Sequence, residues 1–427
     1  MGKITISENR EYFLRDGKPF FYFADTVWSV FSNATIEEWE EYLIYRRTQN
    51  FNAVQISVLP VLHDASNTYT GIYPFHPSSE GNWDFYRIND EFFDKAEKMV
   101  QMACDKGMVP VLVVLWNNYV PGTWANKKVP QYGIPKDAVK PYTEYVVRRF
   151  DKYNPMYFIS GDTRFENEEI VEYYLITLNT LKSLAPHALT AMHITSRFHE
   201  LPEAIVNSDQ LDFYIYQAGH HLEYQQDNYR TAQHFLEKPV KRPVLNAEPP
   251  YEGHGHGNRY GRFNEFDIRK AFWFSVLGGA KAGFTYGAHG VWSWHKRGAE
   301  FTSEEWSKIP FEWRYSLRLP GAWEAAYSKW IFENYQLYDI VPGQQYLLTG
   351  YEDIRMAVSP DLQKAAIYVP YSNDVGVRLD ANEYDFIMID LASRNVLRPE
   401  VEAKGGTATV KMCDFNTDVL IIATKRG

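Results

Sequence analysis

The feature that most constrains the fold is an alternation that repeats between residues 20 and 286. A short apolar run rich in β-branched and aromatic residues is followed by a polar loop and then by a longer stretch with helical spacing. This alternation is typical of βα units, whose strands pair in parallel. The expected strands number eight, at 20–24, 53–58, 109–115, 156–160, 189–193, 211–216, 244–247 and 282–286.

Helices are expected between these strands. Thr35 and Glu38 have the spacing of a capping box, which predicts that a helix begins there. An open doubly wound sheet would usually carry a GxGxxG turn after its first strand, and this chain has none there. The pattern therefore favours an α/β fold of the (β/α)8 TIM-barrel type. The expected helices are 35–49, 90–106, 139–153, 167–183 and 264–277.

The pattern changes after about residue 335. Short strands now follow one another, separated by turn signals and without helical stretches, which is typical of an antiparallel β-sandwich. We therefore divide the chain into a barrel domain over 1–335, with an N-terminal β-hairpin, and a β-sandwich accessory domain over 336–427. The expected strands of the sandwich are 346–350, 355–359, 364–370, 375–379, 385–390, 407–411 and 419–424.

Charge and composition argue against several classes of partner. The net charge of −10 disfavours nucleic acid and anionic membranes. The N-terminus has no signal-peptide pattern and the chain has no 18-residue apolar run, so we expect a cytoplasmic protein. Cys104 and Cys413 do not suggest a disulfide framework in a chain of 427 residues. The oligomeric state stays open.

Two carboxylates stand where a barrel carries its chemistry, after the carboxyl ends of strands. Asp162 follows the fourth expected strand and Glu248 ends the seventh. These strands lie on opposite sides of a barrel mouth, so the two groups could flank a glycosidic bond, one as an acid and the other as a nucleophile or base. The structural alternative is that Glu248 pairs with Arg259 or Arg262 and that Asp162 caps the next helix.

Polar and aromatic residues follow the other strands and are candidates for contacts with a sugar. Aromatic residues make up 16% of the chain, which is typical of proteins that stack on sugar rings. Packing, capping and turn roles are the alternatives, and Trp292 with Trp294 could instead seal the barrel against the sandwich. The candidates for substrate binding are Asp25, Trp28, Trp116, Asn117, Gln217, His221 and Trp292.

We expect neither a metal nor another cofactor. His254 and His256 share a glycine-rich loop, but no third ligand stands in register with them. His220 and His221 are a similar pair. The sequence also has no GxSxG elbow for a serine nucleophile.

Several motifs together resemble the apiosidase-like glycoside hydrolases, grouped near glycoside hydrolase family 140. They are the EYFLRDGKPF hairpin, FADTVWSVF, FNAVQISVLP, SGDTRF, NAEPPYEG and GAHGVWSW, followed by a β-rich part. The resemblance implies a catalytic barrel with a collagen-binding-type sandwich behind it. It also implies a retaining mechanism, with Glu248 as nucleophile and Asp162 as acid/base.

The resemblance further implies an oligosaccharide or polysaccharide substrate of plant type, and it suggests a furanoside such as an apioside or arabinofuranoside. One departure concerns the wider clan of such barrels, which usually has an Asn-Glu pair at the end of the fourth strand. This chain has Gly161 and Asp162 there. The sequence therefore predicts a glycoside hydrolase, and the alternative is a carbohydrate-binding barrel without catalytic activity.

Overall fold

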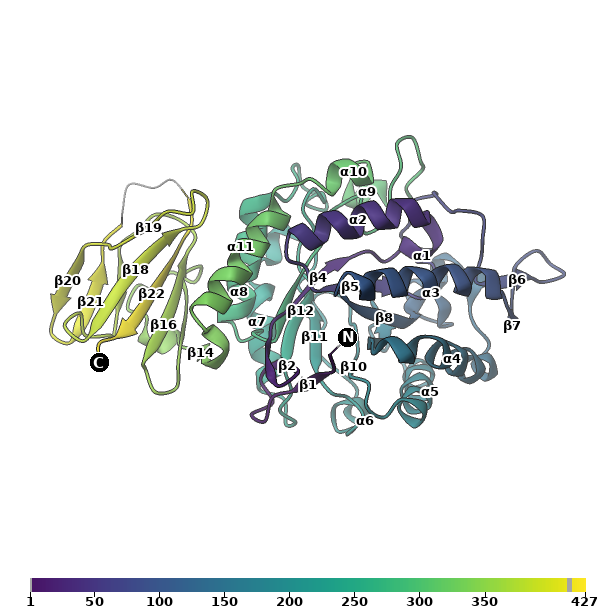
Figure 1. Cartoon of the computed structure of the whole chain (residues 1–427), viewed down its shortest axis with the longest axis horizontal. Coiled ribbons are helices and arrows are strands. Elements are labelled where there is room, and N and C mark those ends of the chain that lie inside the picture. Colours follow the sequence, from purple (N-terminus) through teal and green to yellow (C-terminus); the bar gives the residue numbers. More distant parts are fainter. Residues whose placement is uncertain (1, 413–416) are drawn as a thin grey trace.

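An eight-stranded parallel sheet forms the centre of the structure, a computed structural model that describes residues 2–412 and 417–427. The sheet curls until β13 pairs with β4, and its strands follow one another in chain order (Figure 1). The predicted (β/α)8 barrel is confirmed. Its strands are β4 (Tyr22–Thr26), β5 (Ala53–Ser57), β8 (Val109–Trp116), β9 (Met156–Gly161), β10 (Thr190–Ala191), β11 (Tyr214–Gln217), β12 (Val244–Glu248) and β13 (Gly283–Tyr286).

The barrel has one seam, between β10 and β11, where the described residues form no strand ladder. The backbone N–H of Asp212 donates to the carbonyl of Thr190 at 3.0 Å. The Asp212 carboxylate accepts from the Thr190 N–H at 2.8 Å and from Lys182 at 2.6 Å. A side chain thus replaces part of the missing ladder at this seam.

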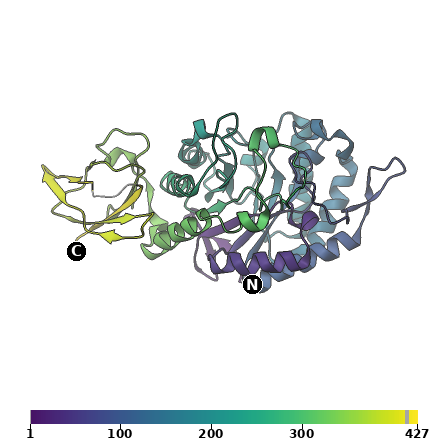
Figure 2. The same ribbon diagram turned by 90° about the horizontal axis from the view of Figure 1, so that it is seen from above.

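Helices surround the barrel, as Figures 1 and 2 show. The expected capping box is present, because Thr35 accepts the Glu38 N–H at 3.2 Å and Glu38 accepts the Thr35 N–H at 3.0 Å. Of the longer helices, the sequence did not predict α7 or α11. The longer helices are α2 (Ile36–Thr48), α3 (Asp90–Asp105), α4 (Lys136–Phe150), α5 (Glu168–Leu184), α7 (Asp227–Leu236), α8 (Glu265–Leu277) and α11 (Gly321–Asn334), and the short ones are α1 (Val30–Asn33), α6 (Glu203–Val206), α9 (Glu304–Ser307) and α10 (Trp313–Ser316).

A small antiparallel sheet of β1 (Ile4–Ile6), β2 (Phe13–Arg15) and β3 (Lys18–Phe20) precedes the barrel. Asp16 and Gly17 join β2 to β3 with φ of 52° and 76°, the positive values of a type I′ hairpin turn. Since β3 leads directly into β4, this sheet lies at the amino ends of the barrel strands. A second hairpin, β6 (Phe75–Pro77) with β7 (Trp83–Ile88), follows β5.

The C-terminal part is an antiparallel sandwich, as predicted. The segment 346–350 is not a strand, because a 3₁₀ turn at Gln344–Tyr346 leads into a single bridge between Leu347 and Val377. The short strands β14, β19 and β20 were not expected. One sheet contains, in spatial order, β14 (Val341–Pro342), β15 (Arg355–Val358), β16 (Lys364–Val369), β22 (Val419–Lys425), β18 (Tyr384–Asp390) and β19 (Val396–Leu397), and the other β17 (Val375–Val377), β21 (Thr407–Val410) and β20 (Val401–Lys404).

A buried ion pair joins the two parts. Arg269 of α8 donates to Asp418 through Nε at 2.9 Å and Nη2 at 2.8 Å, and Tyr368 of β16 donates to the same carboxylate at 3.0 Å. Arg269 and Asp418 are both buried. The sandwich therefore packs against the helices of the barrel through a geometrically fixed contact.

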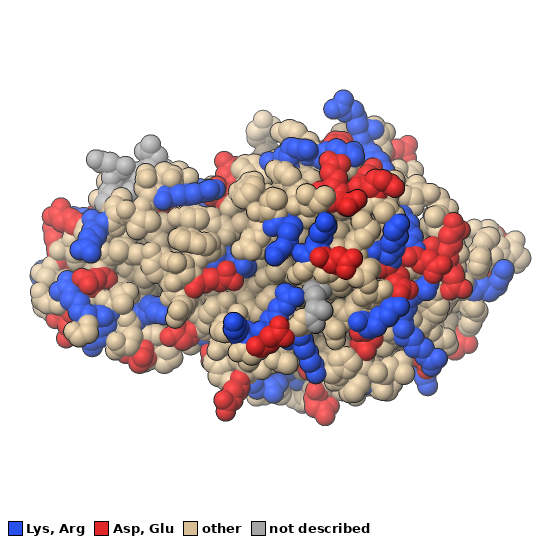
Figure 3. All heavy atoms as spheres, in the orientation of Figure 1, with Lys and Arg blue, Asp and Glu red and all other residues tan. Residues whose placement is uncertain are grey.

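The surface carries acidic and basic side chains in mixture on the face drawn in Figure 3. No helix among the described residues combines the length and the apolar character needed to span a bilayer. Cys413 lies outside the described residues, and Cys104 is half-buried in α3.

Candidate active site

A cavity of about 310 Å³ opens among the loops that follow the carboxyl ends of the barrel strands. Its wall combines indole and imidazole rings with carboxylates and cationic side chains. The structure brings seven of the nine predicted site residues to this wall and leaves two, Asp25 and Asn117, beneath it. The seven are Trp28, Trp116, Asp162, Gln217, His221, Glu248 and Trp292.

Two imidazoles face the carboxylate of Glu248, at the end of β12. His220 Nε2 lies 3.1 Å from Oε1, and His193 Nε2 lies 3.2 Å from Oε2. Burial alone would raise the pKa of Glu248. The two imidazole groups outweigh this effect and hold the pKa at about 2.

The backbone sets the tautomer of both imidazoles. His193 Nδ1 accepts the N–H of Asp162 at 3.0 Å, and His220 Nδ1 accepts the N–H of Tyr251 at 3.2 Å. A nitrogen that accepts carries no proton, so the proton of each ring is on Nε2, the atom that faces Glu248. His220 therefore donates a hydrogen bond to one carboxylate oxygen, while Nε2 of His193 lies within ion-pair distance of the other without the geometry of a hydrogen bond.

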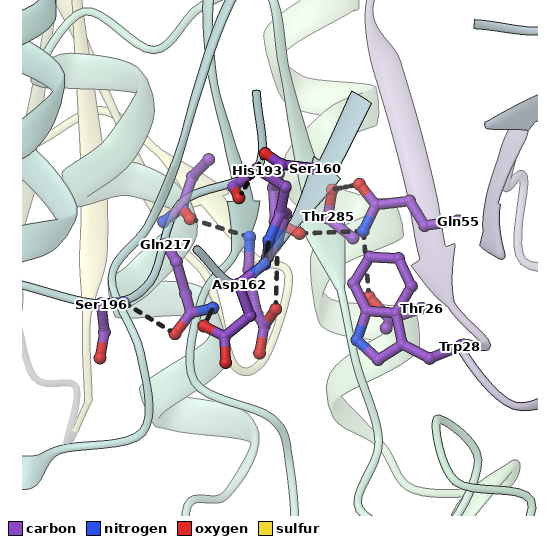
Figure 4. A network of polar contacts seen from close by, with 12 residues as sticks. Thr26, Trp28, Gln55, Ser160, Asp162, His193, Ser196, Gln217 and Thr285 are labelled. Atoms are coloured by element: carbon purple, nitrogen blue, oxygen red, sulfur yellow. Dashed lines mark hydrogen bonds and ion pairs between the residues drawn. The ribbon is translucent and has the colours of Figure 1, made fainter. Parts of the chain in front are cut away.

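Asp162 has the opposite protonation. Burial, together with the charge of Glu248, raises the pKa of Asp162 to about 7. Gln217 Nε2 donates to Asp162 Oδ1 at 3.2 Å, and Gln217 Oε1 accepts the N–H of Ser196 at 3.0 Å, so the side chain of Gln217 is fixed from both ends (Figure 4). Between these two pKa values the site therefore holds a proton on Asp162 and a charge on Glu248.

The turn that carries Asp162 is unusual. Asp162 adopts a φ of 54°, in the left-handed region that Asp tolerates better than most residues. Its carbonyl accepts from Asn117 Nδ2 at 2.6 Å and from Trp124 Nε1 at 3.2 Å. Two side chains of the preceding βα loop thus hold the turn in place.

Aromatic rings order the wall next to Glu248. Trp28 Nε1 donates to the Tyr251 hydroxyl at 3.0 Å. The ring of Trp28 also meets those of Trp116 and His193 edge to face, at 5.1 and 5.5 Å between centroids. A layer of polar groups lies beneath this wall, where Gln55 donates to Thr26 at 3.3 Å (Figure 4).

Asp25 requires a correction, because it does not line the cavity. Its side chain is fully buried, and its Oδ2 accepts from Arg46 at 2.6 Å and from Tyr42 at 2.8 Å. Side chains alternate along a strand, and Thr26 is the neighbour that faces the barrel interior. The predicted sugar contact is therefore replaced by a buried ion pair that ties β4 to α2.

Asn117 also requires a correction. It is fully buried at the end of β8, and its amide reaches the carbonyl of Asp162 rather than the cavity. Asn117 thus positions the turn of Asp162 instead of contacting a sugar.

The structural alternatives for the two carboxylates do not hold. Arg259 pairs with Glu223 at 2.6 Å, and Arg262 donates to the carbonyl of Gly253 at 2.6 Å, so neither meets Glu248. Asn167, not Asp162, caps α5. Trp294 does not seal the barrel against the sandwich, since it stacks on Trp313 and donates to Glu38.

The sequence places Asp64, His193 and His220 after the ends of strands two, five and six, where functional residues are expected. It does not predict that the two histidines meet Glu248, because that contact bridges loops far apart in the chain and has no local signal. Tyr251 and Trp124 also line the cavity and were not singled out by the sequence. The described residues contain no group of three or more His, Cys, Asp or Glu side chains placed to hold a metal ion.

One charged and one protonated carboxyl group thus line the same aromatic-walled cavity at the mouth of the barrel. Glycoside hydrolases use such a pair of carboxyl groups, and the protein is of that class. Residues 7–339 match the model of the apiosidase-like catalytic domain, and the chain therefore belongs to the apiosidase-like family.

Solved structures agree with this fold. A structure described as a glycoside hydrolase superposes with a TM-score of 0.81 at 20% identity, covering 99% of this chain and 97% of that one. A glycoside hydrolase family 5 protein from Bacteroides vulgatus ATCC 8482 also gives a TM-score of 0.81 at 20% identity, covering 99% and 93%. Among curated proteins, none matches this sequence. The two superpositions extend over barrel and sandwich together.

Proposed function

We propose that the protein is a retaining glycoside hydrolase in which Glu248 is the nucleophile and Asp162 the acid/base. The observation that carries this proposal is the opposite protonation of the two groups in one cavity, with pKa values of about 2 and about 7. Between these values the nucleophile is charged while the acid keeps its proton, which is what the first step of retention needs.

In the first step, a Glu248 oxygen attacks the anomeric carbon, and the glycosidic C–O bond breaks as Asp162 gives its proton to the leaving oxygen. In the second step, the ionised Asp162 takes a proton from water, whose oxygen displaces Glu248 from the sugar. The N–H groups of His193 and His220 stabilise the carboxylate that departs in this step. They also weaken it as a nucleophile, so we expect them to favour the second step more than the first.

The cavity supports a small glycone. Its volume of about 310 Å³ is at the lower end of the range of roughly 300–1,000 Å³ for small-molecule sites. We infer that the protein removes terminal residues from plant-type oligosaccharides, with a furanoside such as an apioside or arabinofuranoside as the glycone. Membership of the apiosidase-like family supports this substrate class. In the same proposal, Trp28, Trp116 and Trp292 bound the sugar, while Gln217 and His221 supply polar contacts.

A panel of aryl furanosides and pyranosides tests the proposal, with proton NMR of the anomer released first. We expect turnover with retained configuration, and loss of turnover in Glu248→Gln. Azide should restore activity to Glu248→Ala with an inverted glycosyl azide as product, and to Asp162→Gly with a retained one. Glycine suits the left-handed φ at this position.

An inverted first product would instead assign Glu248 as a base that activates water. A wild-type protein that binds sugars but hydrolyses none would favour the carbohydrate-binding alternative. That alternative predicts a carboxylate turned out of the cavity or locked by an arginine, whereas both carboxylates line the cavity.

A further inference from the structure

A second cavity lies on the sandwich, at the end of the β15–β16 pair. It has a volume of about 360 Å³ and is formed by two loops, residues 351–354 before β15 and residues 370–373 after β16. We call it the sandwich cleft. Arg355 of β15 pairs with Tyr368 of β16, so both loops extend beyond the same end of the sheet and face each other.

Each loop carries an exposed tyrosine. Tyr351 is 63% exposed and Tyr371 is 61% exposed. The ring of Tyr371 is held from one side by Phe266, at 5.7 Å between centroids, and by the ammonium of Lys270 at 5.9 Å. An aromatic ring that is fixed by packing and still mostly open to water is suited to stack on a flat apolar face.

Polar groups accompany the two rings. The hydroxyl of Ser372 is buried and has no hydrogen-bond partner within the part of the chain that the structure describes. Asp353 is ion-paired with Lys270 at 3.2 Å, and Asn373 also lines the cleft. Open aromatic faces beside hydroxyl, amide and carboxylate groups match the alternating apolar faces and hydroxyls of a sugar chain better than they match a charged ligand or a purely apolar one.

The cleft is oriented toward the catalytic end of the barrel. Helices α7 and α8 begin after the loops that follow β11 and β12, so their first turns lie at the end where Glu248 is. The cleft meets these first turns, since Glu352 accepts from Tyr229 of α7 at 2.6 Å and Tyr371 packs on Phe266 of α8. Figure 1 shows both helices on the side of the barrel that faces the sandwich.

We propose that the sandwich cleft is a binding site for a neutral oligosaccharide, separate from the catalytic cavity. This inference rests on the proposed glycoside hydrolase function, because it gives the site a use in holding a longer substrate near the catalytic end. The sandwich then contributes to substrate capture as well as bracing the barrel.

Isothermal titration of the full chain in the Glu248→Gln background tests the site. The probes are neutral arabino-, xylo- and gluco-oligosaccharides of four to six units. We expect binding at two sites, of which Tyr351→Ala/Tyr371→Ala removes one. Loss of both rings should weaken that site at least about tenfold. The matched control is Tyr86→Ala/Tyr315→Ala, since these rings are 61% and 60% exposed elsewhere.

Hydrolysis separates this inference from the proposed function. With an active chain, Tyr351→Ala/Tyr371→Ala should leave kcat/KM for a small aryl glycoside unchanged and lower kcat/KM for a long substrate. Equal oligosaccharide affinity in the double variant and its parent would overturn the cleft, as would a single binding site for every probe. A dimer in size-exclusion chromatography that the double variant abolishes would also overturn it, because a second copy would then occupy the cleft. Failure of the proposed function would show itself differently, as absence of turnover in the wild type.

Discussion

The contact between His220 and Glu248 predicts a shift in the pH dependence of catalysis. The ring of His220 lies between those of Tyr251 and His254, with ring centroids 4.3 Å apart on each side. His220→Phe keeps a ring in this place but removes the Nε2 atom that lies 3.1 Å from Glu248 Oε1. A hydrogen bond to a charged group contributes about 1.5–3 kcal/mol, and one pKa unit is about 1.4 kcal/mol. Loss of this donor should raise the pKa of Glu248 by ~1–2 units.

The sign follows from the charged form. In the proposed mechanism Glu248 attacks as a carboxylate, so kcat/KM should fall on the acid side as the pH drops through the pKa of Glu248. The acid limb should move from about 2 in the wild type to ~3–4 in His220→Phe. The basic limb, set by Asp162 at about 7, should stay where it is, which makes it an internal control.

The assay is kcat/KM for an aryl glycoside between pH 3 and 9, a range in which the wild type should show no acid limb and His220→Phe should show one. Tryptophan fluorescence confirms that the chain stays folded at each pH. His220→Gln is the matched variant, because its amide nitrogen can reach the position of Nε2 and should restore the low acid limb. An acid limb in His220→Phe that coincides with the wild type would refute the electrostatic role of His220. Equal acid limbs in the Phe and Gln variants would attribute the effect to packing.

Other substitutions separate catalysis from stability. Asp162→Asn should lower kcat about 10²–10⁴-fold for glycosides with poor leaving groups, and much less for 2,4-dinitrophenyl glycosides. It should also abolish the basic limb of the pH profile. A basic limb that stays unchanged would mean that a group other than Asp162 sets it. Asp25→Asn leaves Arg46 buried without a matching charge, so urea denaturation should show that the free energy of unfolding falls by about 3–5 kcal/mol while KM stays unchanged. A raised KM with unchanged stability would instead show that Asp25 contacts the sugar. Arg269→Met leaves the buried Asp418 without its cationic partner and should lower the free energy of unfolding by a similar amount in the same urea assay. An unchanged stability would show that the contact between barrel and sandwich is dispensable.

The sequence predicted most of the barrel because its strands are buried on both faces and read as continuous apolar runs. In β8, all eight residues are apolar or proline and all are buried. It missed α7 and α11, although in α7 the buried Tyr229, Ala232 and Phe235 stand at helical spacing. It also placed a strand at 346–350, where apolar residues are held by a turn and one bridge instead of a ladder.

The candidate site was only partly predictable for a different reason. The end of each strand can be found from the chain alone, and this places Asp162 and Glu248 at one mouth. Which way a side chain points depends on the alternation along the strand, and this turns Asp25 toward α2. The partners of Glu248 could not be found, because His193 and His220 reach it across loops that only the closed barrel brings together.

The left-handed turn at Asp162 limits how this enzyme can change in evolution. Among acidic residues, Asp tolerates a φ of 54° better than the longer Glu, whereas Asn and Gly occupy it at little cost. A single codon change can therefore remove the proposed acid while preserving the backbone. Replacing Asp162 by the longer Glu requires that the turn held by Asn117 and Trp124 be rebuilt. We expect related sequences that keep this turn to retain a short side chain here, and sequences with Glu to differ in the turn as well.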